Sequence, residues 1–255
     1  MTAALARDGF AVLAQDARVL AWAEAARPAA LAVLSDPEMR ARWLRHGGTW
    51  FVGVDALPNG PDGRIGGVPL AGSWDGLIGP LQPLHRAQLS VTWPGYPRRD
   101  PDESEAAHRF RLKRDAAHLD GLLAEGPQKR RFLREPHAWI LGLPLTPTAA
   151  SPLVVWAGSH EVIRAAFKEV FAGRAPADWA SIDVTEAYAA ARAEVVETCQ
   201  RVEVPLMPGQ AVVMHRLAIH GVAPWAAGAE GPREGRMVAY FRPLLADPGD
   251  WLALP

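Results

Sequence analysis

The chain beyond residue 85 is a series of short apolar runs, and this feature most restricts its fold. Each run has the length of one strand and is bounded by turn residues: 86–93, 137–145, 151–158, 201–206, 209–215 and 236–245. Apolar runs of this length between glycine and proline indicate buried strands. The 23 glycines and 23 prolines supply the many turns that such a chain needs. We therefore expect a β-sandwich of short strands with long loops.

Helical patterns precede this strand-rich part and form one insertion within it. An alanine-rich helix is expected over 17–35 with an interruption at Pro28, and a second helix over 35–47 with Asp36 as its N-cap. The segment 94–110 is expected to be a polar loop. The chain is thus predicted to be one α+β domain, divided as follows: a helical part at about 1–48, a β core at about 49–245, and a helical insertion at about 161–200.

Composition excludes several classes of protein. The formal net charge of −1 argues against a general nucleic-acid binder. The single cysteine, Cys199, allows neither an intrachain disulfide nor a cysteine-rich zinc site. No apolar stretch reaches the roughly 20 residues of a membrane span, and the N-terminus lacks a signal-peptide pattern. A cytoplasmic protein without a membrane or nucleic-acid partner is expected.

The stretch "HLD" places a histidine and an aspartate two residues apart. On an extended strand, His118 and Asp120 project from the same face and offer two metal ligands. His215 and His220, at the end of a later strand, are both candidates for a third. Two histidines and one carboxylate on one face of an ion leave adjacent positions open, as in non-haem iron(II) oxygenases. The alternative is that these are packed or hydrogen-bonding side chains.

Four motifs in order resemble the phytanoyl-CoA dioxygenase family of iron(II)- and 2-oxoglutarate-dependent oxygenases. They are "DGFAVL" (8–13), "HLD", "PLVVWAGSHE" (152–161) and "PGQAVVMHRLAIHG" (208–221), and the similarity covers about residues 8–243. The resemblance implies a double-stranded β-helix, or cupin-like jelly roll, with iron(II) at its open end. It implies that His118, Asp120 and His220 are the metal ligands. Because related halogenases lack the carboxylate, Asp120 favours hydroxylation or a similar oxidation.

The resemblance also implies an arginine, on the strand after the distal histidine, that binds the far carboxylate of 2-oxoglutarate. Arg236 fits this position best, and its planar guanidinium suits a bidentate contact. Arg242 lies on the same face of the strand, and Arg233 is the fallback. Val222 departs from the small polar residue that the family often has there. Gln88 is the expected replacement, on a strand face that it shares with Ser90 and Thr92.

Two further histidines are assigned to structure. His160 belongs to the Gly-Ser-His turn of the resemblance, where Ser159 or His160 is expected to cap a helix that begins near Glu161. His215 precedes His220 by five residues and faces the other way on a straight strand. It is expected to lie in the core or to support the site.

The substrate is not named by the sequence. Two basic segments, 108–115 and 128–137, flank "HLD" and predict an anionic small molecule if they line the site; nearby acidic residues favour a solvated loop instead. The resemblance implies oxidation of a small organic substrate by dioxygen, with release of succinate and CO2. Two alternatives stay open: a cupin-like metal isomerase or hydrolase that does not use 2-oxoglutarate, and a non-catalytic jelly-roll binding protein.

Overall fold

The computed structural model describes residues 3–79 and 83–254. Its strands are β1 (Phe10–Leu13), β2 (Leu44–Arg45), β3 (Trp50–Gly53), β4 (Gln88–Thr92), β5 (Leu122–Glu125), β6 (Arg130–Leu133), β7 (Trp139–Pro144), β8 (Leu153–Ala157), β9 (Gln200–Val204), β10 (Ala211–His215), β11 (His220–Val222) and β12 (Arg236–Phe241). Its helices are α1 (Ala3–Asp8), α2 (Ala17–Ser35), α3 (Pro37–Trp43), α4 (Asp75–Ile78), α5 (Glu105–Arg114), α6 (Ser159–Val170), the 3-10 helix η1 (Pro176–Ser181), α7 (Thr185–Thr198) and α8 (Asp250–Ala253).

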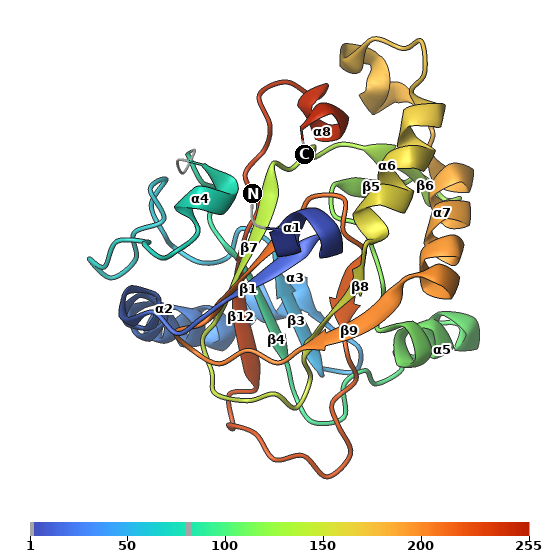
Figure 1. Cartoon of the computed structure of the whole chain (residues 1–255). Helices are drawn as coiled ribbons and strands as arrows, with labels where there is room; N and C mark the ends of the chain where they lie inside the picture. The colour runs from blue at the N-terminus through green and yellow to red at the C-terminus, as the bar shows by residue number, and fades with distance from the viewer. Residues whose placement is uncertain (1–2, 80–82, 255) are drawn as a thin grey trace.

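Two antiparallel sheets face each other, as Figure 1 shows. The larger has the strand order β1-β10-β7-β12-β4-β3-β2, and the smaller has the order β11-β8-β9. Strands that neighbour each other are mostly distant in sequence, which is typical of a jelly roll. A separate hairpin, β5-β6, follows "HLD". The expected α+β jelly roll, or double-stranded β-helix, is confirmed.

Strand alternation decides which side chains reach the space between the sheets. On β12, Met237, Ala239 and Phe241 point outward into the core beneath α2, together with Leu89 and Val91 of β4. The intervening residues therefore face the smaller sheet. Inward-facing apolar side chains form a separate core between the sheets, which includes Ile140, Leu153, Val155, Val212 and Met214.

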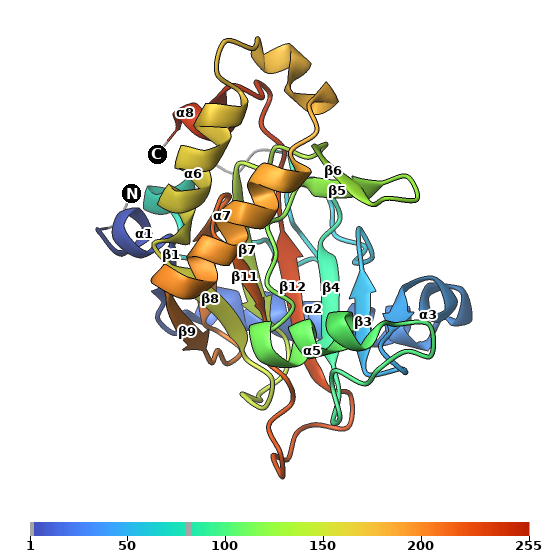
Figure 2. The same cartoon turned by 90° about the vertical axis from the view of Figure 1, so that its right-hand side faces the viewer.

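Helices cover the outer face of each sheet, as the two views show (Figures 1 and 2). Trp22, Ala26 and Ala30 of α2 pack on the larger sheet. Ile163 and Phe167 of α6 and the apolar side of α7 pack on the smaller sheet. The helical insertion therefore fills the second outer layer. Within residues 3–79 and 83–254, no helix is long and apolar enough to cross a membrane.

Two local expectations were wrong. The helix α2 runs from Ala17 to Ser35 without a break at Pro28, because its packing on the sheet outweighs the one lost backbone hydrogen bond. The segment 94–110 contains the start of α5, which Ser104 caps by accepting a hydrogen bond from the backbone N–H of Ala107. The cap at Asp36, in contrast, is confirmed by its bond from Glu38 N (2.8 Å).

Candidate metal centre

The structure brings together His118, Asp120 and His220. His118 Nε2 lies 3.4 Å from Asp120 Oδ1, and His220 Nε2 lies 3.9 Å from Asp120 Oδ2. The three ligand atoms lie within 4.8 Å of one another. An octahedral ion with bonds of about 2.1 Å holds adjacent ligand atoms about 3.0 Å apart, so these side chains must move closer together to bind one. The three side chains thus form a group that can hold a metal ion.

Backbone pairing explains why two distant histidines meet. His118 N donates to His220 O (2.8 Å) and His220 N donates to His118 O (3.1 Å), so "HLD" extends the smaller sheet beyond β11. Gly221 makes this approach possible, because a Cβ there would lie 2.1 Å from Asp115 O.

Both imidazoles are oriented in the same way. His118 Nδ1 lies 3.0 Å from Ala116 O, and His220 Nδ1 lies 3.0 Å from Ala218 O. A carbonyl oxygen only accepts, so each Nδ1 carries the proton and each Nε2 keeps its lone pair. This is how metal-binding histidines are commonly fixed in proteins. Both free lone pairs belong to the atoms that face Asp120.

Electrostatics favours the ligating protonation states. Burial and His118 lower the pKa of His220 to about 4, so its imidazole is neutral at neutral pH. Burial raises the pKa of Asp120, but Arg242, His118 and His220 outweigh it and hold that pKa well below its ordinary value. Arg242 Nη1 donates to Asp120 Oδ2 over 3.1 Å. Arg242 therefore fixes one oxygen of the carboxylate and leaves Oδ1 facing His118.

A cavity of about 150 Å³ lies against this group, between the two sheets. Cavities of this size hold one small organic molecule. His118, Asp120 and His220 form part of its wall; the remaining lining residues are Trp50, Val52, Gln88, Ser90, Ile140, Leu153, Gly221, Val222, Tyr240 and Arg242. The polar lining residues of β4 and β12 come from the inward-facing positions that strand alternation selects. A smaller cavity, which we call the outer cavity, shares Gln88, Tyr240 and Arg242 with the first one.

Arg236 is buried, with 5% of its surface exposed, and its Nη1 has no hydrogen-bond partner within the described part of the chain; the residue does not line the cavity. Its cross-strand neighbour is Thr92, whose Oγ1 is also buried without a partner there. Buried polar groups are normally paired, so two adjacent orphans at one end of the inward face indicate a site for a polar ligand. Arg233, by contrast, is exposed. Gln88 lies four residues from Thr92 and lines the cavity near Arg242.

His160 and His215, the two histidines that the sequence assigned to structure, support the fold, with one correction. Helix α6 begins at Ser159 and has Gly158 as its N-cap, without a side-chain cap bond; neither Ser159 nor His160 caps it. Ser159 Oγ instead accepts from Ile219 N (2.9 Å), next to His220. His215 is buried at the end of β10, where its Nδ1 accepts from Leu217 N (2.9 Å). It lies in the core, as the strand parity predicted.

The two basic segments do not line the cavity of the candidate metal centre. Several of their arginines pair with acids: Arg111 with Glu103, Arg130 with Asp183, and Arg134 with Glu125. The sequence offered two interpretations of the basic segments, an anionic-substrate site or a solvated region balanced by acidic residues. These ion pairs agree with the second interpretation. The sequence did not reveal Arg242 as the partner of Asp120. The even spacing of Arg236 and Arg242 was the only signal that placed Arg242 on the inward face.

Comparison with known proteins identifies the fold. No protein-family model and no curated protein sequence matches the chain. A solved structure, the non-haem alpha-ketoglutarate-dependent carbocyclase SnoK from nogalamycin biosynthesis, matches with a TM-score of 0.52 and 15% identity, over 96% of this chain and 82% of that one. The chain has the SnoK fold.

Two further matches have lower TM-scores. EctD from S. alaskensis, solved with 2-oxoglutarate and 5-hydroxyectoine, has a TM-score of 0.46 and 17% identity, over 95% of this chain and 75% of that one. The alpha-ketoglutarate-dependent epimerase SnoN has a TM-score of 0.45 and 15% identity, over 94% and 79%. SnoK and SnoN are described as non-haem, alpha-ketoglutarate-dependent enzymes. They catalyse different reactions, and at these identities the likeness concerns the fold.

Proposed function

We propose that the chain is a non-haem iron(II)- and 2-oxoglutarate-dependent oxygenase of the phytanoyl-CoA dioxygenase type. One observation carries this proposal: His118, Asp120 and His220 converge at a cavity, with both Nε2 lone pairs free and facing the carboxylate. Two neutral imidazoles and one carboxylate are the donors that suit iron(II) in such enzymes. The iron, with 2-oxoglutarate and dioxygen, supplies the oxidising chemistry when bound.

The residues of the chain have separate tasks in this proposal. His118, Asp120 and His220 hold the metal, and Arg242 keeps the Asp120 carboxylate ionised and oriented. Arg236 binds the distal carboxylate of 2-oxoglutarate, with Thr92 as a second donor. The fit rests on the two buried orphan atoms, Arg236 Nη1 and Thr92 Oγ1, on paired strands. Gln88 contacts the co-substrate or the substrate from the cavity wall. The apolar wall limits the access of water.

The substrate is a small organic molecule, which we propose is hydroxylated or otherwise oxidised with release of succinate and CO2. The two open cavities that meet at Gln88, Tyr240 and Arg242 give it a place beside the metal. Arg86, which is exposed at the outer cavity, offers a cationic contact to an anionic substrate, while Asp55 and Glu135 lie there too.

Titration of the apo-protein with iron(II) and 2-oxoglutarate under anaerobic conditions tests the proposal. A weak visible charge-transfer band is expected, because the keto acid chelates iron(II) in such complexes. Binding of iron without the band would favour the cupin-like metal enzyme that does not use 2-oxoglutarate. Absence of iron binding would favour a non-catalytic binding protein. The same titration of Asp120→Asn is the matched control and should give no band.

A further inference from the structure

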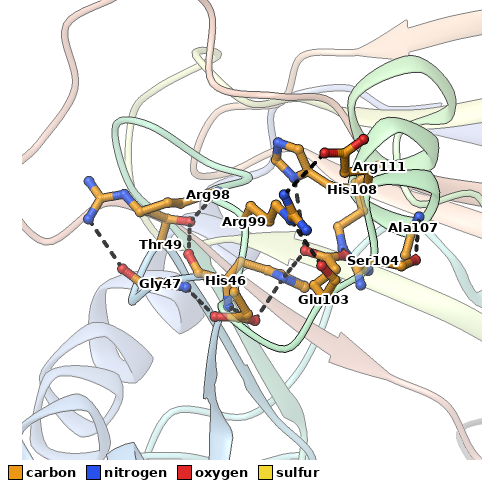
Figure 3. Close-up of polar contacts among 12 residues, drawn as sticks. His46, Gly47, Thr49, Arg98, Arg99, Glu103, Ser104, Ala107, His108 and Arg111 are labelled. Carbon is orange, nitrogen blue, oxygen red and sulfur yellow. Dashed lines mark hydrogen bonds and ion pairs between the residues drawn. The ribbon is translucent and has the colours of Figure 1, made fainter.

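A second cluster of potential metal ligands lies outside the candidate metal centre, between the turn after β2 and helix α5 (Figure 3). His46 comes from the turn, Asp100 and Glu103 from the segment before α5, and His108 from α5 itself. His46 Nδ1 lies 3.3 Å from Asp100 Oδ2 and 3.9 Å from Glu103 Oε2. His108 Nδ1 also lies 3.9 Å from Glu103 Oε2. The ligand atoms of His46, Asp100 and Glu103 lie within 4.8 Å of one another, and His108 adjoins this group through Glu103.

Three of these atoms are buried and unpaired. His46 Nδ1, Glu103 Oε2 and His108 Nδ1 have no hydrogen-bond partner among the described residues. His46 is only 5% exposed as a residue, and the Glu103 side chain is only 7% exposed. Buried polar atoms in proteins are nearly always satisfied by a partner. Three such atoms that face one another indicate that a ligand belongs between them.

The spacing suits a metal ion better than a water molecule. A tetrahedral ion with imidazole and carboxylate ligands at about 2.0–2.2 Å holds its ligand atoms about 3.3–3.6 Å apart. The pair of atoms at 3.3 Å fits this spacing, and the two pairs at 3.9 Å need to close by a few tenths of an ångström. A water molecule at hydrogen-bond distance, about 2.8 Å, separates tetrahedrally placed partners by about 4.6 Å. Direct hydrogen bonds across 3.9 Å are too long.

Neighbouring groups fix the carboxylates in place. Arg111 Nε donates to Glu103 Oε1 (2.6 Å), which leaves Glu103 Oε2 turned toward the two histidines. Asp100 accepts from the backbone N–H groups of His46 (2.8 Å) and Gly47 (2.6 Å). Outer contacts of this kind orient the ligands of metal sites. Arg111 pairs with Glu103, whereas Asp100 accepts only from backbone N–H groups among the described residues. The Asp100 carboxylate therefore keeps a negative charge that favours a divalent cation.

We propose that His46, Asp100, Glu103 and His108 form a second metal site, which binds zinc(II) or a similar divalent transition ion. Imidazole and carboxylate ligands suit zinc, whereas calcium and magnesium prefer oxygen alone. The ion joins α5 to the turn that precedes β3. His46 also stacks on Trp50, with ring centroids 5.5 Å apart, and Trp50 lines the cavity of the first centre. The second site thus stabilises one wall of that cavity.

Zinc binding per chain tests this proposal. The apo-protein is dialysed against zinc(II), and bound metal is measured by emission spectroscopy, for the wild type, His118→Ala/Asp120→Ala, Glu103→Gln/His108→Ala, and the combined variant. Zinc readily occupies imidazole sites that serve iron(II). We therefore expect two equivalents of bound zinc per chain for the wild type, one for each of the two double variants, and none for the combined variant. A His85→Ala variant, which removes an exposed histidine outside both groups, should bind two.

Each outcome separates the two sites. If Glu103→Gln/His108→Ala still binds as much zinc as the wild type, the second site is wrong. If His118→Ala/Asp120→Ala binds none, the second site is wrong as well. If His118→Ala/Asp120→Ala binds as much zinc as the wild type, the first centre is wrong instead. Glu103→Gln alone keeps an oxygen that can accept from Arg111, so it serves if the double variant does not fold. The circular dichroism spectrum of Glu103→Gln must match that of the wild type. This variant should bind one equivalent of zinc less than the wild type, and the rise in Tm that zinc produces in the wild type should be absent.

Discussion

His118 and His220 are 102 residues apart in sequence, yet each donates its backbone N–H to the carbonyl of the other, over 2.8 and 3.1 Å. This reciprocal pair places their ring centroids 4.5 Å apart. The separation of the two imidazoles is therefore set by a β-bridge and not by flexible side chains. A rigid backbone support of this kind preorganises a ligand set before the metal arrives.

The first prediction concerns the carboxylate of the candidate metal centre. Asp120→Asn keeps the shape of the side chain but removes the anionic donor, and it leaves Arg242 beside a neutral group. We expect iron(II) affinity to fall by at least about 100-fold, since loss of an outer partner alone costs 10–100-fold. Anaerobic calorimetric titration measures it. Asp55→Asn, at an exposed position of the outer cavity, is the control and should bind normally.

The second prediction separates the three arginines. Arg236→Leu should weaken 2-oxoglutarate about 100-fold with little change in iron(II) affinity, because a buried charge pair is lost. Thr92→Val should weaken it about 5-fold, the worth of one hydrogen bond. Arg233→Leu should change neither the iron(II) affinity nor the 2-oxoglutarate affinity. Arg242→Leu should mainly lower the iron(II) affinity, because Arg242 orients the Asp120 carboxylate. Normal 2-oxoglutarate binding by Arg236→Leu would refute the assignment of that residue.

The third prediction concerns Gly221. A Cβ at this position would lie 2.1 Å from the backbone oxygen of Asp115, so the segment that carries His118 must move away from β11. We expect Gly221→Ala to lower the free energy of unfolding by about 2–4 kcal/mol and to weaken iron(II) binding. Urea unfolding measures the first effect. Gly76→Ala is the control, because no atom lies within 4 Å of a Cβ there; equal loss in both variants would contradict the argument.

The fourth prediction concerns acid stability. Burial, with the nearby cations, lowers the pKa of His215 to about 2. An unfolded histidine takes up its proton near pH 6.5, so the unfolded state binds more protons between those values. Stability should therefore fall as pH decreases below about 6.5, with a contribution from His215 of about 2.7 kcal/mol at pH 4.5.

His215→Gln isolates this contribution, because glutamine does not titrate. The difference in unfolding free energy between pH 7 and pH 4.5 should be smaller in the variant by about the amount given above. Urea unfolding at the two pH values measures it. If the difference were the same in the variant and the wild type, His215 would have to take up its proton in the folded protein with an ordinary histidine pKa.

Much of the candidate site was accessible from local pattern. The spacing of His118 and Asp120 predicted a shared face on a strand; the structure has only an isolated bridge at His118, yet the two side chains do converge at 3.4 Å. The strand over 86–93 predicted that Gln88, Ser90 and Thr92 share a face, and Gln88 and Ser90 line the cavity. Period-two alternation is a property of one strand and needs no knowledge of its partners.

Other features depended on contacts between distant segments. The partner of Asp120, Arg242, was assigned only as an alternative for the co-substrate, because an ion pair across 122 residues leaves no local signal. Pro28 does not break α2, since packing on the larger sheet decides that helix. Ser159 bonds to Ile219 and does not cap α6.

The sequence by itself determined the strand lengths, the faces of the strands and the donor types of the candidate centre, because these follow from the local geometry of the chain. Tertiary structure alone decided which strands pair, which charges meet and which polar atoms stay unpaired in the interior. His46, Asp100 and Glu103 form no recognisable motif in the sequence, and their convergence, with His108 beside Glu103, depends on the packing of the segment before α5 and of α5 itself against the turn after β2. Such convergence comes from contacts that the local sequence does not encode.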